Sequence, residues 1–427
     1  HIGRKKMSKK KIKVLTLGDM PLSTSGVAHQ TRLMIEALLH TGKFQVVSLG
    51  GAIKHKDHKP IRTEEFGEDW TVFPVEGFGS PDMVRSIIRN EKPDICWIMT
   101  DPRFYDWLWQ IEDEIRPLMP IVYYHVWDNY PYPKFNRKWY LSNDVICAIS
   151  KLTEDIVRTV TPEVECHYVP HAVKTEIFKK IPQQDVNGLV KDNFPDWDNK
   201  KFIFFWNNRN ARRKMPGSVL WWFKGFLDDV GHDKAMLLMH TDPYDVNGPN
   251  LQAVVEELKL TDGQVLFSRG KHPPHTLAAM YNMADCTINI SDAEGFGLST
   301  LESLACGTPV IATMTGGLQD QVTDGTNFFG VGIEPASKAV IGSQMVPFIY
   351  EDRVCKKDFM DALHKMYSMS TEERDSLGKM GRQHVLNFFN WKDYGERWVE
   401  MMTRIHRDYG SWDTRKNYKS WTFEEAA

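Results

Sequence analysis

The sequence has no run of about 20 consecutive apolar residues, which is the length that an α-helix needs to cross a bilayer. It also has no charged start followed by an apolar stretch, the pattern of a secretory signal. We therefore expect a soluble protein without an integral membrane segment. A peripheral contact with a membrane stays open.

Cysteine pairs at redox or metal-binding spacing are missing as well. The six cysteines are scattered along the chain, several of them inside apolar runs, and none forms a Cys-x-x-Cys pair. This distribution is typical of reduced, buried thiols, so it predicts a cytoplasmic protein.

The sequence also lacks a large excess of charge of either sign. The chain carries 53 Lys and Arg against 56 Asp and Glu, a net charge of -3, so it has no overall attraction to polyanions. The basic run from Arg4 to Lys13 indicates a solvated tail. With 42% hydrophobic and 26% charged residues, the composition is that of a globular enzyme, neither disordered nor fibrous.

The chain of 427 residues is too long for one ordinary core and predicts two domains. Short apolar runs alternate with helical patterns in two series, which is typical of α/β folds with doubly wound, Rossmann-like parallel sheets. A predicted helix at 30–39 lies between the first two strands. The predicted strands are 13–17, 44–49, 95–99, 121–125 and 145–149, then 202–206, 236–239, 265–268, 287–290 and 310–312.

A polar stretch with Pro and Asp marks the boundary between the two series. We assign 1–185 to an N-terminal domain, 186–200 to a linker, 201–385 to a C-terminal domain and 386–427 to a final helical segment. Two such domains facing each other would bring the carboxyl ends of both sheets to one cleft, where these folds bind ligands.

The segment from Ser291 to Gly317 carries the strongest functional signal. A strand ends there in a turn with Gly295 and Gly297, and a helix follows. Free backbone N–H groups at a helix start favour a phosphate, and glycines let the main chain approach it. Glu302 can accept from the two hydroxyls of a ribose. The plain alternative is a capped helix, with Ser299 or Thr300 as the capping residue.

The pattern Glu294-x7-Glu302, followed by Ala-Cys-Gly-Thr-Pro-Val at 305–310, resembles the retaining GT-B glycosyltransferases of family 4. The resemblance implies a GT-B fold in which 201–385 binds a nucleotide sugar, Glu302 holds its ribose and Glu294 contacts the donor sugar near the reacting carbon. It also implies that Phe296, Gly297, Leu298, Ser299 and Thr300 meet the donor sugar and phosphate.

Other positions extend the resemblance. Arg209 and Lys214 have the family's spacing after the first strand of the second domain, which implies that both cations face the diphosphate and that both are catalytic, as is Glu294. Gly26 resembles the family's glycine loop under the donor phosphate, although Ser25 replaces its first glycine. His125 resembles the family's catalytic histidine at the donor sugar. The segment from Asn390 resembles the one that crosses back to the first domain.

The acceptor is expected on the N-terminal domain, with Trp127, Asp128 and Tyr130 as candidate contacts. A glycan or small metabolite is the first expectation, and a hydroxymethylated base in DNA is the second. A non-catalytic nucleotide-sugar sensor and a nucleotide-sugar epimerase are the rival functions. The family reading implies transfer with retention of configuration. These residues do not specify the nucleotide base, the donor sugar or the oligomeric state.

We expect no metal and no cofactor besides the nucleotide sugar, which is a substrate. Asp196 and Asp198 have the Asp-x-Asp form of a metal site, but a linker turn explains them. His272 and His275 are separated by two prolines and have no third ligand nearby in the sequence. Glu294 and Glu302 flank the predicted phosphate turn, which argues against a glycosidase.

Overall fold

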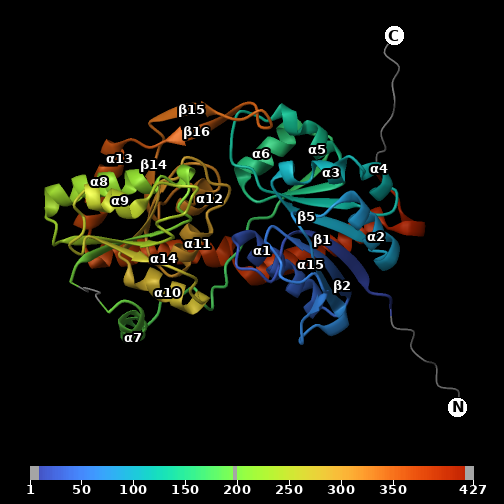
Figure 1. The fold of residues 1–427 in the computed structure, drawn as a ribbon, viewed down its shortest axis with the longest axis horizontal. Coiled ribbons are helices and arrows are strands. Elements are labelled where there is room, and N and C mark those ends of the chain that lie inside the picture. The colour runs from blue at the N-terminus through green and yellow to red at the C-terminus, as the bar shows by residue number, and fades with distance from the viewer. Residues whose placement is uncertain (1–8, 196–199, 419–427) are drawn as a thin grey trace, which may run out of the picture.

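A computed structural model of the chain describes residues 9–195 and 200–418, and these fold into two α/β domains (Figure 1). The predicted Asp196 and Asp198 lie outside the described residues. No helix among the described residues is long and apolar enough to cross a membrane. All six cysteines are free.

The N-terminal domain is built on an eight-stranded sheet with the order β3-β4-β2-β1-β5-β6-β7-β8. Its strands pair in parallel, except that β3 pairs antiparallel with β4. The central strands are buried apolar runs because helices cover both faces of a parallel sheet. The strands are β1 Ile12–Asp19, β2 Phe44–Gly51, β3 Ile61–Arg62, β4 Trp70–Pro74, β5 Ile95–Thr100, β6 Ile121–His125, β7 Val145–Ala148 and β8 Glu165–Tyr168.

The C-terminal domain has a six-stranded parallel sheet with the order β11-β10-β9-β12-β13-β14. A separate antiparallel hairpin, β15 and β16, follows it. The strands are β9 Phe202–Asn207, β10 Ala235–His240, β11 Val265–Ser268, β12 Cys286–Asn289, β13 Val310–Thr313, β14 Gly330–Ile333, β15 Ser337–Ile341 and β16 Ile349–Arg353.

Helices connect the strands and cover the sheets (Figure 1). Those of the N-terminal domain are α1 Gly26–His40, α2 Pro81–Glu91, α3 Asp106–Trp109, α4 Glu112–Ile115, α5 Arg137–Leu141 and α6 Lys151–Val160. The later ones are α7 Gln183–Asn193, α8 Pro216–Val230, α9 Leu251–Glu257, α10 Pro274–Met283, α11 Leu298–Ala305, α12 Leu318–Val322, α13 Lys356–Ser368, α14 Thr371–Phe388 and α15 Trp391–Tyr409.

These strand orders confirm the predicted fold class, and all ten predicted strands are present. In each sheet the chain reverses its direction of travel between two neighbouring strands, β1 and β5 in the first and β9 and β12 in the second. Ligands bind at such switch points, beyond the carboxyl ends of the strands. In the C-terminal sheet, the loops that follow β9 and β12 are therefore the expected ligand site.

The last helix, α15, returns to the N-terminal domain and packs against α1. Gly395 makes the close approach possible, because a β-carbon there would lie 2.8 Å from Ala37 Cβ. Trp398 is fully buried and contacts the rings of Trp97 and Tyr124 edge-on. The segment expected to be a linker at 186–200 instead contains most of α7, which packs against α10.

Removal of the Trp398 side chain should separate α15 from the N-terminal core. We expect Trp398→Ala to lower the free energy of unfolding by about 3–5 kcal/mol, because it leaves a large cavity. Trp221→Ala is the matched control, since Trp221 is 57% exposed. Denaturant unfolding of both variants makes the measurement, and equal losses would show that Trp398 does not anchor the segment.

Candidate functional site

The loops that leave β9 and β12 meet at the switch point of the C-terminal sheet. The turn after β12 is held from behind by the Gly316–Gly317 turn, where the Gly317 N–H donates to the Glu294 carbonyl over 3.0 Å. A β-carbon at Gly316 would lie 1.9 Å from the same carbonyl oxygen, and Gly316 has a φ of +50°. Only glycine fits there, so the turn around Glu294 has a fixed shape.

Lys214 and Glu294 form an ion pair at the centre of this region, and both side chains are buried. Arg213 adds a second positive charge, with its guanidinium 3.7 Å from Glu294 Oε1, and donates to the Ala293 carbonyl over 2.7 Å. Burial alone would raise the pKa of Glu294, but Lys214 and Arg213 outweigh it and hold that pKa below its ordinary value. Glu294 is therefore a carboxylate at neutral pH.

Arg209 lies away from this pair. Its guanidinium contacts Asp245 over 2.8 Å, and its side chain is 67% exposed. The structure thus brings together two of the expected catalytic residues, Lys214 and Glu294, and adds Arg213, which the sequence did not single out. The role of Arg209 at the diphosphate stays a prediction. Arg213 could have been suggested only by its position next to Lys214 in the sequence.

The helix after the turn, α11, starts without a capping side chain. Its N-cap is Gly297, with φ at +91°, so the plain alternative, in which Ser299 or Thr300 caps the helix, is wrong. The glycine has no side-chain oxygen that could accept from the backbone N–H groups of the first turn. Thr300 Oγ1 is also buried without a hydrogen-bond partner in the described part of the chain. Such a helix start favours an anion.

Gly26 of the N-terminal domain lies directly beside this helix start. A β-carbon at Gly26 would lie 2.9 Å from Leu298 Cδ1, so the two domains are in contact here. Ser25 acts as the N-cap of α1, and its hydroxyl accepts from the Ala28 N–H over 3.1 Å. The start of α1 thus faces the start of α11.

Glu302 lies one turn into α11 and is half-buried. The Tyr281 hydroxyl donates to Glu302 Oε2 over 2.7 Å, and Asn207 at the end of β9 donates to that hydroxyl over 2.8 Å. Burial raises the pKa of Glu302 to about 7, partly offset by the hydrogen bond from Tyr281. Among the described residues none donates a hydrogen bond to Oε1, which can accept one from a ligand. Sequence reasoning missed Tyr281 and Asn207, because their link to Glu302 exists only in the fold.

The opposite wall comes from the loop that follows β6. A β-carbon at Gly295 would lie 3.2 Å from Val126 Cγ1, and one at Gly316 would lie 3.7 Å from Asp128 Cβ. Burial raises the pKa of Asp128 to about 6, and the nearby Glu294 adds to the shift. Asp128 makes no hydrogen bond to the residues that the structure describes. Its carboxyl is therefore available to a ligand beside Glu294.

His125 does not have the place expected of a catalytic residue. It is fully buried, its Nδ1 lies 3.0 Å from the Tyr123 hydroxyl, and its Nε2 lies 2.6 Å from the Tyr140 hydroxyl. Burial lowers the pKa of His125 to about 3, so the ring is neutral. Both nitrogens are used inside the N-terminal domain, and the geometry supports a structural role. Its contact with the donor sugar stays a prediction that this geometry does not favour.

The aromatic side chains expected at the ligand also make contacts within the protein. Trp127 is buried and its indole N–H donates to the Asn129 carbonyl over 2.9 Å, while the Tyr130 hydroxyl donates to Asp155 over 2.6 Å. Phe296 is buried against the ring of Phe389. A ligand could meet the backbone of Phe296, whereas its side chain belongs to the core.

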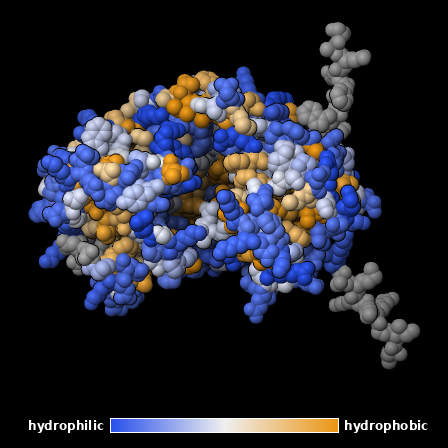
Figure 2. All heavy atoms as spheres, in the orientation of Figure 1, coloured by the Kyte–Doolittle hydropathy of each residue, from blue (hydrophilic) through white to orange (hydrophobic). Residues whose placement is uncertain are grey.

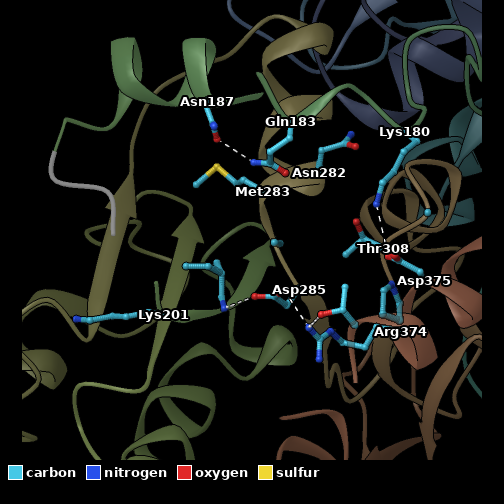
Figure 3. Close-up of a pocket in the computed structure, with 15 residues that line it drawn as sticks. Lys180, Gln183, Asn187, Lys201, Asn282, Met283, Asp285, Thr308, Arg374 and Asp375 are labelled. Atoms are coloured by element: carbon cyan, nitrogen blue, oxygen red, sulfur yellow. Dashed lines mark hydrogen bonds and ion pairs between the residues drawn. The ribbon is translucent and has the colours of Figure 1, made fainter. Parts of the chain in front are cut away.

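A polar cavity of about 470 Å³ lies at the opposite edge of the C-terminal sheet, where the strands begin (Figure 3). Two ion pairs lie in its wall, Lys180 with Asp375 at 3.7 Å and Arg374 with Asp285 at 3.6 Å. This edge is far from the switch-point loops in a doubly wound sheet. The two ion pairs join α14 to the residue before β12 and to the segment before α7.

No group of three or more His, Cys, Asp or Glu side chains in the described ranges could hold a metal ion. In particular, His272 lies 2.9 Å from the Ser268 hydroxyl, which also lies 2.9 Å from His240 Nδ1. His272 and His240 are thus linked through Ser268 and do not surround a shared ion site.

Two Rossmann-like domains that meet at the carboxyl ends of their sheets, with an uncapped helix start between them, define the GT-B class of fold. Figure 2 shows that this face of the molecule is hollowed between the two lobes. The chain is similar in structure to sucrose-phosphate synthase from Thermosynechococcus elongatus, with a TM-score of 0.73 and 16% identity over 93% of this chain and 100% of that one. It is also similar to Anabaena HepE in complex with UDP-glucose, with a TM-score of 0.67 and 12% identity over 92% of this chain and 100% of that one.

Residues 232–342 match the family model of group 1 glycosyl transferases. A D-inositol 3-phosphate glycosyltransferase from Paenarthrobacter aurescens is 31% identical over 140 residues, which cover 33% of this chain and 28% of that protein. The chain thus spans under a third of the length of this curated relative. The matched residues include Glu294 and Glu302, so the C-terminal domain is similar to group 1 glycosyltransferases in the segment that carries the predicted resemblance.

The Lys214–Glu294 pair should make a measurable contribution to stability. We expect Lys214→Met to lower the free energy of unfolding by about 3–5 kcal/mol, because it leaves a buried carboxylate with a weaker partner. The double variant Lys214→Met/Glu294→Leu should recover most of that loss, since neither charge is then left unpaired. Denaturant unfolding measures both, and additive losses would contradict a direct pair.

Proposed function

We propose that the protein transfers a sugar from a nucleotide-diphosphate sugar to a hydroxyl of a small metabolite, with retention of configuration. The observation that carries the proposal is the uncapped start of α11, flanked by Lys214 on one side and by Glu302 on the other. The family match of the same domain supports a sugar-nucleotide donor.

Three parts of the donor, its diphosphate, its ribose and its sugar, contact different parts of the site. The diphosphate lies at the start of α11, where Ser299, Thr300 and the backbone N–H groups receive its oxygens. The ribose hydroxyls donate to Glu302, which Tyr281 holds in place. The sugar then extends past Gly297 toward Glu294 and Asp128.

Transfer breaks the bond between the anomeric carbon and the β-phosphate oxygen. The acceptor oxygen bonds to the same face of that carbon, and its proton passes to the leaving phosphate oxygen. Negative charge builds up on the phosphate as the bond breaks, so fixed cations accelerate the reaction where that charge develops. Lys214 and Arg213 supply this charge from the protein itself, and we propose that transfer needs no metal.

The acceptor is placed beside Asp128, whose free carboxyl can accept a hydrogen bond from a hydroxyl. The matching curated relative is named for an inositol phosphate, a small polyol, which supports a metabolite of that size. A base in DNA as the acceptor stays a prediction that no contact in this site favours.

Incubation with a panel of nucleotide sugars and polyol acceptors tests the proposal. We expect transfer in the presence of EDTA, and NMR of the product should show the anomeric configuration of the donor. Lys214→Ala should lower kcat about tenfold to a hundredfold or more, since it removes a charge-assisted contact. An inverted product would refute retention, and nucleotide-sugar binding without turnover would indicate a sensor.

Donor binding should depend on pH through Glu302. Its pKa of about 7 lies above the ordinary value of 4.5, so the side chain is neutral below that pH and a stronger acceptor above it. We expect the affinity for a nucleoside diphosphate such as UDP or GDP to increase as the pH rises from about 6 to about 8, by less than about tenfold per unit. Calorimetry across this range makes the measurement.

Glu302→Gln is the control for this titration, because the amide keeps the shape of the side chain and cannot ionise. The terminal phosphate of the nucleotide titrates equally in both proteins, so the difference between them reports Glu302. Equal pH profiles would rule out a ribose contact through this carboxylate.

A further inference from the structure

The β15–β16 hairpin lies outside both main sheets and connects the two domains. It leaves the C-terminal domain after β14 and returns before α13, and in Figure 1 its connecting loop reaches across the top of the view toward the N-terminal domain. Apolar surface gathers over the hairpin in Figure 2, where Val340, Met345 and Phe348 are exposed.

The base of the hairpin is joined to both donor-side loops. Glu351 is buried and accepts from the Arg212 guanidinium over 2.9 Å, on the loop that carries Lys214. Arg353 contacts Asp292 over 2.8 Å, on the turn that carries Glu294. The Asp352 N–H also donates to the Asp292 carbonyl over 2.9 Å. The hairpin therefore has a fixed place relative to the Lys214–Glu294 pair.

The other side of the hairpin is joined to the acceptor-side loop. The Asn129 side-chain amide donates to the Tyr350 carbonyl over 2.6 Å, and the Tyr350 N–H donates to the Tyr130 carbonyl over 2.5 Å. Val346, in the connecting loop, is buried in the hydrophobic cluster of the N-terminal domain that includes Trp127. Asn129 and Tyr130 directly follow Asp128 in the chain, and each of them forms one of these two hydrogen bonds.

We propose that this hairpin is a strap that sets the separation between Asp128 and the Lys214–Glu294 pair, so that Asn129 and Val346 act as positioning residues for sugar transfer. The inference rests on the proposed function for its catalytic consequence. Its structural part, the coupling of the two domains through the hairpin, stands on the contacts alone.

Positioning matters here because the two reacting molecules are held by different domains. The donor is bound by α11 and its neighbours, and the acceptor hydroxyl is bound beside Asp128. A misplacement of about 1 Å between such groups can lower a rate about a hundredfold. Without the strap, the loop after β6 would keep its fold but lose its fixed distance from Glu294.

Two variants test the strap at separate contacts. Val346→Ser removes the apolar anchor, and Asn129→Ala removes the side-chain bond to Tyr350. We expect each to lower kcat about tenfold while the donor KM changes less than about twofold, because donor contacts stay intact. Val340→Ser is the matched control on the same hairpin, since Val340 is 63% exposed, and it should behave like the wild type.

A distance measurement tests the strap without any activity. Spin labels at Lys138→Cys in α5 and Lys357→Cys in α13, in a Cys355→Ser background, report the separation of the domains. The other five cysteines are buried and should not be labelled. Val346→Ser and Asn129→Ala should broaden the distance distribution, and Val340→Ser should not.

The combined results separate the possible failures. Unchanged distance distributions in both variants would overturn the strap, as would a parallel loss of kcat and donor affinity, which would show that the donor contacts themselves are disturbed. A smaller folded fraction lowers the apparent kcat alone, so kcat is calculated per folded protein, measured by circular dichroism. If the wild-type chain transfers no sugar, the proposed function fails while a broadened distribution still supports the strap.

Discussion

The buried Lys214–Glu294 ion pair is the constraint around which the site is arranged. Two charges removed from water are tolerated only when each keeps its partner, so the loop after β9 and the turn after β12 cannot move apart independently. The turn after β12 packs directly against Gly316, where a β-carbon would lie 1.9 Å from the Glu294 carbonyl oxygen, so only glycine can occupy that position. The same turn ends at Gly297 and leaves α11 uncapped. The buried ion pair and the glycine turn thus fix the shape of the segment that leads into α11.

The neighbours of this pair extend the constraint to the second domain. Arg212 and Asp292, close to Lys214 and Glu294 in sequence, point the other way and bind the β15–β16 hairpin. Burial raises the pKa of Asp292 to about 6, although the Arg353 charge opposes the shift. Protonation of Asp292 would remove its charge from this contact. Each donor-side loop therefore has one charge turned to the site and another turned to the hairpin.

The sequence predicted the two sheets and singled out the segment from Glu294 to Glu302 because both depend on local patterns. Buried parallel strands are continuous apolar runs, and the Glu294 to Glu302 segment is contiguous. β14 and β15 were missed because one is glycine-rich and the other mostly exposed, so neither has the apolar signal of a core strand. His125 follows a strand as expected, but only the fold shows that two tyrosine hydroxyls occupy its ring nitrogens.

The acceptor half is harder to predict for a physical reason. Its residues come from separate loops and are placed by tertiary contacts, of which the bond from Asn129 to the Tyr350 carbonyl is the clearest, 221 residues apart in the chain. The start of α11 offers main-chain N–H groups, and a change of side chain leaves them in place. Asp128 instead depends on a loop that the other domain holds. A change in the hairpin can therefore move the loop that carries Asp128 while the residues of α11 stay in place.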